Sequence, residues 1–275
     1  GDWCIAQFAK ALGKTENYNT FIKRSENWRN MYDAKSTFMR PKSTNNIFLK
    51  DFTPKEYSPY FCESNAWQYF WSVQHNIEGL TEIVGGKAPF EQKLDSMFTL
   101  NPLPTDKLPI FSTGMIGQYA HGNEPSHHVA YLYNYIDIPW KTQKLVRTIL
   151  ETQYKNEPDG HCGNEDCGQM SSWYVFSALG FYPVNPAQGI YAIGSPLVNA
   201  ATVHLENGKT FTIEALNNNS DNIYIQSIKL NGKKIERNYI THNEVIRGGK
   251  LVFKMGNKPN KNSKNAMALT SKMYK

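Results

Sequence analysis

The stretch Gly160–Val184, GHCGNEDCGQMSSWYVFSALGFYPV, joins a polar loop directly to an apolar helix. The loop contains Asn164, Glu165 and Asp166 in a row, punctuated by Gly and Cys. Residues 168–180 follow with aromatic and aliphatic side chains at helical spacing, which predicts a helix. Two adjacent carboxylates at the entrance of so apolar a helix indicate either a helix cap or a catalytic loop.

Two more junctions have the same design. Glu63 precedes the stretch NAWQYFW, and Asn123 with Glu124 precedes Pro125, a residue suited to the first turn of a helix. Capping explains one such junction well, because carboxylates and short polar side chains satisfy the free N–H groups of a helix start. Three are harder to explain as caps alone, since each is followed by a surplus of aromatic residues: Trp67, Tyr69, Phe70 and Trp71; Tyr131, Tyr133 and Tyr135; Trp173, Tyr174 and Phe176.

The rest of the first 190 residues also predicts helices. Residues 2–12 and 15–33 have apolar side chains three and four positions apart and are separated by Gly13, which predicts a helical hairpin. A long polar loop follows, and further helices are predicted near 65–84, 88–99, 125–136 and 139–154. In a ring of such hairpins, alternate helix N-termini lie at one end, so the three carboxylate loops would converge there.

The periodicity changes after residue 193. ATVHLENGKTFTIEAL, IYIQSIKLNGKKIE and KLVFKM alternate between apolar and polar residues, and Asn207-Gly208 and Asn231-Gly232 are strong hairpin signals. We therefore predict an α+β fold with two units. Residues 1–192 form a mostly helical portion and residues 193–275 form a small antiparallel β domain with a basic tail.

Composition excludes several classes of protein. No stretch approaches the roughly 20 apolar residues of a membrane-spanning helix, and mean hydropathy is −0.56. The net charge of +6 comes from residues 250–275, which hold seven lysines and no Asp or Glu. This tail has no accompanying recognition motif, so we expect no nucleic-acid partner. Phosphate-binding glycine loops and a GxSxG nucleophile motif do not occur.

Cysteine and histidine give weaker signals. Cys4, Cys62, Cys162 and Cys167 lack paired CxxC spacing, which argues against a structural zinc site. The neighbouring residues His127 and His128 diverge on a helix and cannot share one ion. Packing histidines held by hydrogen bonds are the commoner explanation for such a pair.

Along most of its length the chain resembles glycoside hydrolase family 92, the bacterial calcium-dependent exo-α-mannosidases. The segments that carry the resemblance are DWCIAQFAKALG, FMRPK, ESNAWQY, HGNEPSHHVAYLYNY, GNEDCGQMSSWYVFSALGFYPVNP and YAIGSPLV. The resemblance covers the C-terminal part of such an enzyme. It implies that residues 1–192 belong to an (α/α)6 barrel and that an N-terminal β-sandwich domain of the same protein is their partner.

The resemblance implies inverting hydrolysis of terminal α-linked mannose in mannan or N-glycan chains. Glu63 falls at the position of the general acid, Asp166 at that of the general base, and Asn123 and Glu124 on the calcium-binding segment. The expected substrate contacts are Trp67, Gln68, His121, Asn164 and Glu165. Many members have Asp at the position of Asn164, which leaves Asp166 as the expected base, and we would expect Gly at the position of Ser64.

The resemblance also implies a cellular location, and two alternative functions fit the same residues. We expect a periplasmic, secreted or cell-surface bacterial protein with no membrane span. Another (α/α) toroid hydrolase acting on other α-glycosides would use the same carboxylates without calcium. A carbohydrate-binding or scaffold fragment would bind mannosides without turnover.

Overall fold

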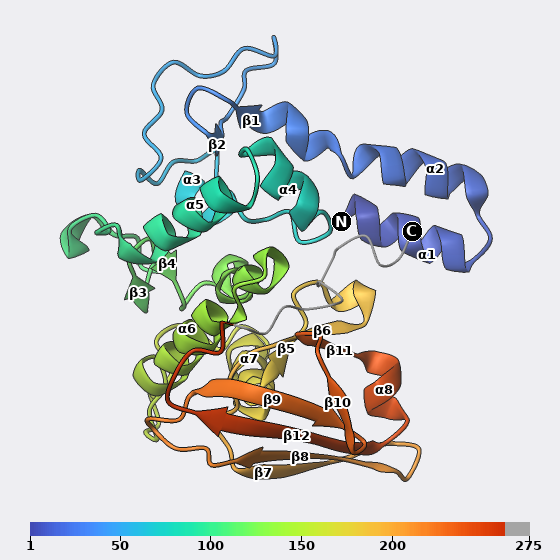
Figure 1. The fold of residues 1–275 in the computed structure, drawn as a ribbon. Coiled ribbons are helices and arrows are strands. Elements are labelled where there is room, and N and C mark those ends of the chain that lie inside the picture. The colour runs from blue at the N-terminus through green and yellow to red at the C-terminus, as the bar shows by residue number, and fades with distance from the viewer. Residues whose placement is uncertain (262–275) are drawn as a thin grey trace.

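The computed structural model describes residues 1–261 and confirms an α+β protein. Figure 1 shows the N-terminal helices and the long loops in the upper part and the largest sheet in the lower part. Most of the predicted basic tail, residues 262–275, lies outside the described residues. None of the helices in the described part of the chain is long and apolar enough to cross a membrane.

The first hairpin forms as predicted, but its second helix is shorter. Helices α1 (Asp2–Ala11) and α2 (Thr15–Arg24) are joined through Gly13, whose φ of 67° suits glycine. The chain then enters a 3-10 turn, η1 (Asn27–Met31), and the strand pair β1 (Tyr32–Asp33) and β2 (Phe38–Met39). The expected continuation of helix to residue 33 is therefore wrong. Buried Asp33 instead pairs with Arg40 at 2.9 Å, a tertiary contact that local periodicity does not reveal.

The predicted helix 65–84 is two helices, α3 (Ala66–Tyr69) and α4 (Ile77–Ile83). The side chain of Asn76 accepts a hydrogen bond from Gly79 N at 3.0 Å and starts a new helix in the middle of the apolar run. Helix α5 (Lys87–Thr99) matches the prediction for 88–99. Short elements follow: η2 (Thr105–Lys107), β3 (Met115–Ile116) and β4 (Tyr119–Ala120).

The segment predicted as a helix at 125–136 has 3-10 geometry. It consists of η3 (Glu124–Ser126) and η4 (Val129–Ile136), and every side chain of η4 is buried. Packing from all sides overrides the preference for an α-helix here. Helix α6 (Pro139–Thr152) confirms the next prediction, and α7 (Gln169–Leu179) is the helix of the opening stretch.

The C-terminal strands form a five-stranded sheet in the order β10-β9-β12-β8-β7. Its strands are β7 (Ala200–His204), β8 (Thr210–Leu216), β9 (Tyr224–Leu230), β10 (Lys233–Ile235) and β12 (Gly249–Gly256). Both Asn-Gly turns lie where the sequence predicts them, between β7 and β8 and between β9 and β10. One correction applies to the antiparallel prediction, because β12 pairs with β8 in parallel.

A second sheet spans the predicted boundary at residues 192/193. Strands β5 (Phe181–Tyr182) and β6 (Ile190–Ile193) pair, and β11 (Tyr239–Thr241) returns to the other side of β6. The turn η5 (Pro186–Gln188) and helix α8 (His242–Ile246) flank these strands. The larger apolar core lies among the helices, and a second one lies under the five-stranded sheet.

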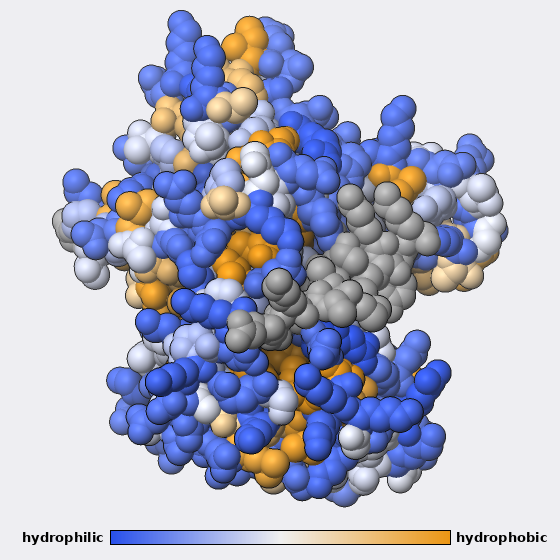
Figure 2. Space-filling view, viewed as in Figure 1, coloured by the Kyte–Doolittle hydropathy of each residue, from blue (hydrophilic) through white to orange (hydrophobic). Residues whose placement is uncertain are grey.

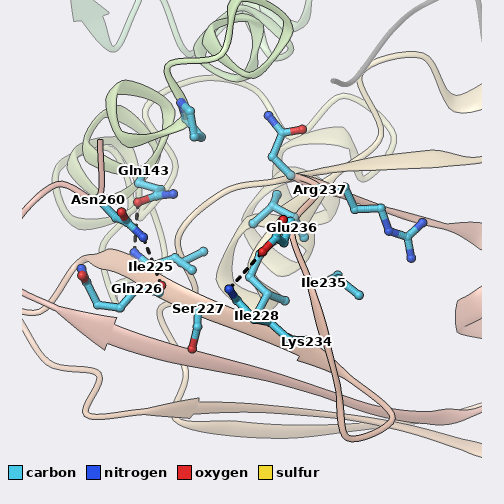
Figure 3. Close-up of a pocket in the computed structure, with 13 residues that line it drawn as sticks. Gln143, Ile225, Gln226, Ser227, Ile228, Lys234, Ile235, Glu236, Arg237 and Asn260 are labelled. Carbon is cyan, nitrogen blue, oxygen red and sulfur yellow. Dashed lines mark hydrogen bonds and ion pairs between the residues drawn. The ribbon is translucent and has the colours of Figure 1, made fainter. Parts of the chain in front are cut away.

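The outer surface of this fold is mostly polar. Figure 2 shows a predominantly hydrophilic face with separate apolar patches. A cavity of about 430 Å³ lies between α6 and the strands β9 and β10. Figure 3 shows Gln143 bonded to Ile225 on one side of this cavity and the Lys234–Glu236 ion pair on the other.

Candidate active site

In the first carboxylate loop, Glu63 lies before the N-cap residue of helix α3. Asn65 caps α3 by accepting a hydrogen bond from Gln68 N at 3.1 Å, so Glu63 is not required as a cap. Glu63 is exposed and has a φ of 50°. A left-handed glutamate costs on the order of 1–3 kcal/mol, and such strain is concentrated at functional sites. The neighbouring Ser64 is not among the residues with positive φ, so glycine is not needed there.

The second loop places Asn123 and Glu124 at the start of η3. The Asn123 amide nitrogen donates to the Glu63 carbonyl oxygen at 2.7 Å, which ties this loop to the first. One carboxylate oxygen of Glu124, Oε1, is buried without a hydrogen-bond partner among the described residues. A buried carboxylate oxygen without a donor is costly unless a proton or a cation compensates it.

The third loop turns sharply before α7. Asp166, Cys167 and Gly168 have φ values of 45°, 58° and 88° in succession. Gly168 is the N-cap of α7 and has no side chain, and Glu165 supplies the side-chain acceptor for the first turn of this helix. Its carboxylate accepts hydrogen bonds from Ser171 N at 3.1 Å and Ser171 Oγ at 2.8 Å and lies 2.9 Å from His161 Nδ1. These hydrogen bonds from Ser171, followed by the neighbouring His161, lower the pKa of Glu165. Of these adjacent carboxylates, Glu165 is therefore engaged at the helix start, whereas Asp166 is exposed.

The three loops converge, as the sequence predicts. Gly122 and Gly163 bring the second and third loops into backbone contact, because a Cβ on Gly163 would lie 2.5 Å from Gly122 O. Burial raises the pKa of Glu124, and a hydrogen bond and negative charge from Asp166, with further negative charge from Glu63, raise it again. Glu124 therefore lies within electrostatic reach of both predicted catalytic carboxylates.

The site contains some of the oxygen ligands that a hard cation needs. Asp166 is among the neighbours that raise the pKa of Glu124, and two neighbouring carboxylates repel each other unless a proton or a cation lies between them. Because the Asn123 nitrogen faces Glu63, its amide oxygen is directed away from that carbonyl. Calcium accepts carboxylate, amide, water and hydroxyl oxygens. No group of three or more His, Cys, Asp or Glu in the described residues could hold a metal, so other ligands would have to complete the shell.

Three predicted substrate contacts lie in the protein interior. Trp67 packs edge-on against Phe38 with ring centroids 4.8 Å apart. The Gln68 amide bonds with Ser64, Tyr57 and the Gln118 carbonyl. Both ring nitrogens of His121 lie 2.7 Å from tyrosine hydroxyls, and burial holds its pKa well below the usual value. These geometries favour a supporting role, and direct contact with the substrate stays a prediction, as it does for the exposed Asn164 and Glu165.

The sequence did not predict the links among these loops. His127 Nε2 bonds to the His121 carbonyl at 2.9 Å, and His128 Nε2 bonds to the Trp71 carbonyl at 2.8 Å. Burial lowers the pKa of each histidine to about 4. The interpretation of both as packing histidines is confirmed. All four cysteines are free thiols.

A helical scaffold that presents separated carboxylates on converging loops is typical of hydrolases that use one acid and one base, above all glycosidases. The catalytic-domain model of glycosyl hydrolase family 92 matches residues 1–257. The chain belongs to this family.

Individual relatives agree with that assignment. The chain is 31% identical over 283 residues to a fungal protein from Arthroderma benhamiae described as an uncharacterized secreted glycosidase, covering 93% of this chain and 34% of that protein. A family GH92 α-mannosidase from Bacteroides thetaiotaomicron, solved with mannoimidazole, superimposes with a TM-score of 0.91 at 42% identity, over 95% of this chain and 35% of that chain. A GH92 inverting mannosidase from the same species gives 0.85 at 41% identity, over 95% and 36%. The chain therefore spans about a third of the length of these relatives.

Proposed function

We propose that the protein acts as a glycoside hydrolase that removes terminal α-linked mannose from mannan or N-glycan chains with inversion. The observation that carries the proposal is the convergence of Glu63 and Asp166, two exposed carboxylates in left-handed conformation, around the half-buried Glu124. Family membership and the mannosidases among the solved relatives support the choice of mannose.

Glu63 is proposed as the general acid and Asp166 as the general base. Glu63 gives its proton to the glycosidic oxygen as the leaving sugar departs. Asp166 takes a proton from the water that attacks the anomeric carbon on the opposite face. Inversion requires room for that water, so we expect the two carboxyl groups to stand roughly 6.5–9.5 Å apart in the complex with substrate.

Asn123 and Glu124 are proposed to hold a calcium ion. Bound there, the ion would supply a Lewis acid for adjacent sugar hydroxyls. The residues themselves do two things without it: Asn123 fixes the position of the Glu63 backbone, and Glu124 places negative charge beside Asp166. A cation would remove the repulsion between these carboxylates.

The wider setting is also proposed. The helices would form part of an (α/α)6 toroid, partnered by an N-terminal β-sandwich domain, in a periplasmic, secreted or cell-surface protein. The secreted glycosidase among the relatives supports an extracytoplasmic location.

Proton NMR of the natural full-length protein with α-linked mannobiose tests the function. We expect the first mannose released to be the β-anomer, before mutarotation equilibrates it. Release of the α-anomer would overturn inversion. Binding of mannobiose without release of mannose would favour the carbohydrate-binding alternative, and equal hydrolysis of α-glucobiose would favour another toroid glycosidase.

A further inference from the structure

The turn that carries Asp166 needs support from outside itself. Asp166, Cys167 and Gly168 form the longest run of positive φ among the described residues, and two of the three have a side chain. Consecutive left-handed residues persist only where surrounding contacts hold them, because the right-handed region is otherwise preferred. The contacts on each side of this turn therefore decide where the Asp166 carboxylate lies.

One side of the turn is held by Glu165, which accepts the hydrogen bonds from Ser171 described above. The other side is held by Gln169, the first residue of α7. Its side-chain amide nitrogen, Nε2, donates to His127 Nδ1 at 3.0 Å and to Tyr182 Oη at 3.1 Å. Gln169 is also the residue whose backbone N–H bonds to the Asp166 carbonyl, at 3.3 Å.

His127 can accept this bond because its tautomer is fixed. Its Nε2 must carry the proton, since it donates to the carbonyl oxygen of His121 at 2.9 Å. Nδ1 is therefore an acceptor, matched to the amide donor of Gln169. Trp173 of α7 also donates to the His127 carbonyl at 2.9 Å. His127 thus links the loop of Asn123 and Glu124 to the helix that follows Asp166.

We propose that Gln169, held by His127, is a positioning residue that fixes the left-handed turn of Asp166 against the loop of Glu124. The proposal rests on the proposed function for the role of Asp166 as base. Its structural part, the anchoring of residues 165–168, does not depend on that role. Gln169 itself is assigned no contact with substrate.

The test compares Gln169→Met with two controls in the full-length natural protein. Methionine keeps the length and apolar stem of the side chain and removes the donor. We expect kcat to fall roughly ten- to a hundredfold, because small misplacements of a reacting group have effects of that order, with KM changed by less than about threefold. Hydrogen exchange of the amides in 165–171 should become faster.

The controls separate positioning from general loss of core hydrogen bonds. Ser177 lies on the same helix as Gln169 and accepts a buried hydrogen bond from Tyr131 Oη at 2.8 Å. Ser177→Ala removes this acceptor and should lower Tm while kcat stays unchanged. Tyr182→Phe removes the other acceptor of Gln169 and should leave most of the activity, since the bond to His127 remains. If Gln169→Met does not fold, Gln169→Asn retains the amide but cannot reach His127, and the same comparison applies.

Two results would overturn the proposal. One is unchanged exchange in 165–171 together with unchanged kcat in Gln169→Met. The other is an equal fall of kcat in Ser177→Ala. Full activity in Asp166→Asn would overturn the proposed function instead, and the exchange measurement would then decide the anchoring by itself.

Discussion

The converging loops and the five-stranded sheet place their left-handed residues differently. In the sheet, positive φ occurs at turn positions such as Gly208, Asn231 and Gly232, where the residue type tolerates it. In the loops it occurs at Glu63, Asp166 and Cys167, and two of these are the proposed acid and base. The sheet is built for stability, whereas the loops hold strain that the helices beneath them support.

The largest effect should follow from changing the base. Asp166→Asn keeps the size of the side chain and removes its ability to accept a proton. We expect turnover to fall by about 10³-fold or more, also on mannosides with good leaving groups, because water attack is still required. Steady-state kinetics on an aryl mannoside measures this. Strong activity in Asp166→Asn combined with loss in Glu165→Gln would mean that the roles of the two residues are exchanged.

In the sheet the largest effect should be on stability. Phe211 is fully buried in the core under the five-stranded sheet. Phe211→Ala should lower the free energy of unfolding by about 3–5 kcal/mol, through lost burial and a cavity. Denaturant unfolding measures it, and kcat of the folded fraction should stay near that of the natural protein. A matching fall in kcat would show that the core under the sheet also holds the carboxylate loops in place.

The same contrast explains what the sequence could predict. The Asn-Gly hairpins and helices α5 and α6 follow from local signals, and the structure confirms them. The break at Asn76, the 3-10 geometry of η4 and the parallel pairing of β12 depend on contacts far along the chain. The convergence of the loops was predictable from repeated junctions, but the Gln169–His127 link was not, because forty-odd residues separate its partners.

A smaller effect is expected for the acid. Glu63→Gln should lower turnover of natural mannosides by roughly 10²-fold. Mannosides with good leaving groups need little protonation and should be affected much less. Comparing kcat/KM for mannobiose and for a dinitrophenyl mannoside measures the difference. An equal loss on both substrates would contradict an acid role and would leave Glu63 as a structural residue.

The next-largest effect on activity should follow from removing the calcium ion proposed at Asn123 and Glu124. Removing metal with a chelator should lower activity by roughly tenfold or more, and calcium should restore it. Glu124→Ala should reproduce the stripped state and abolish calcium binding in calorimetry. A purely capping Glu124 would instead change stability by about 1 kcal/mol and leave catalysis intact. Activity unaffected by the chelator would remove calcium from the mechanism.

The smallest effects come from two helix caps, one in each region. In the β part, Thr241 and Glu244 form a reciprocal capping box at α8, so Thr241→Ala should lower the free energy of unfolding by about 1 kcal/mol and leave kcat unchanged. In the loop region, Glu165 caps α7 through Ser171 and adjoins the turn of Asp166. Glu165→Ala should therefore lower kcat severalfold with a small change in Tm, since a cap beside a strained turn also sets the position of the base. Thermal unfolding and kinetics on both variants give the comparison directly. If Glu165→Ala behaves like Thr241→Ala, with lower stability and full kcat, the loop tolerates a loose cap and Gln169 alone must hold the turn.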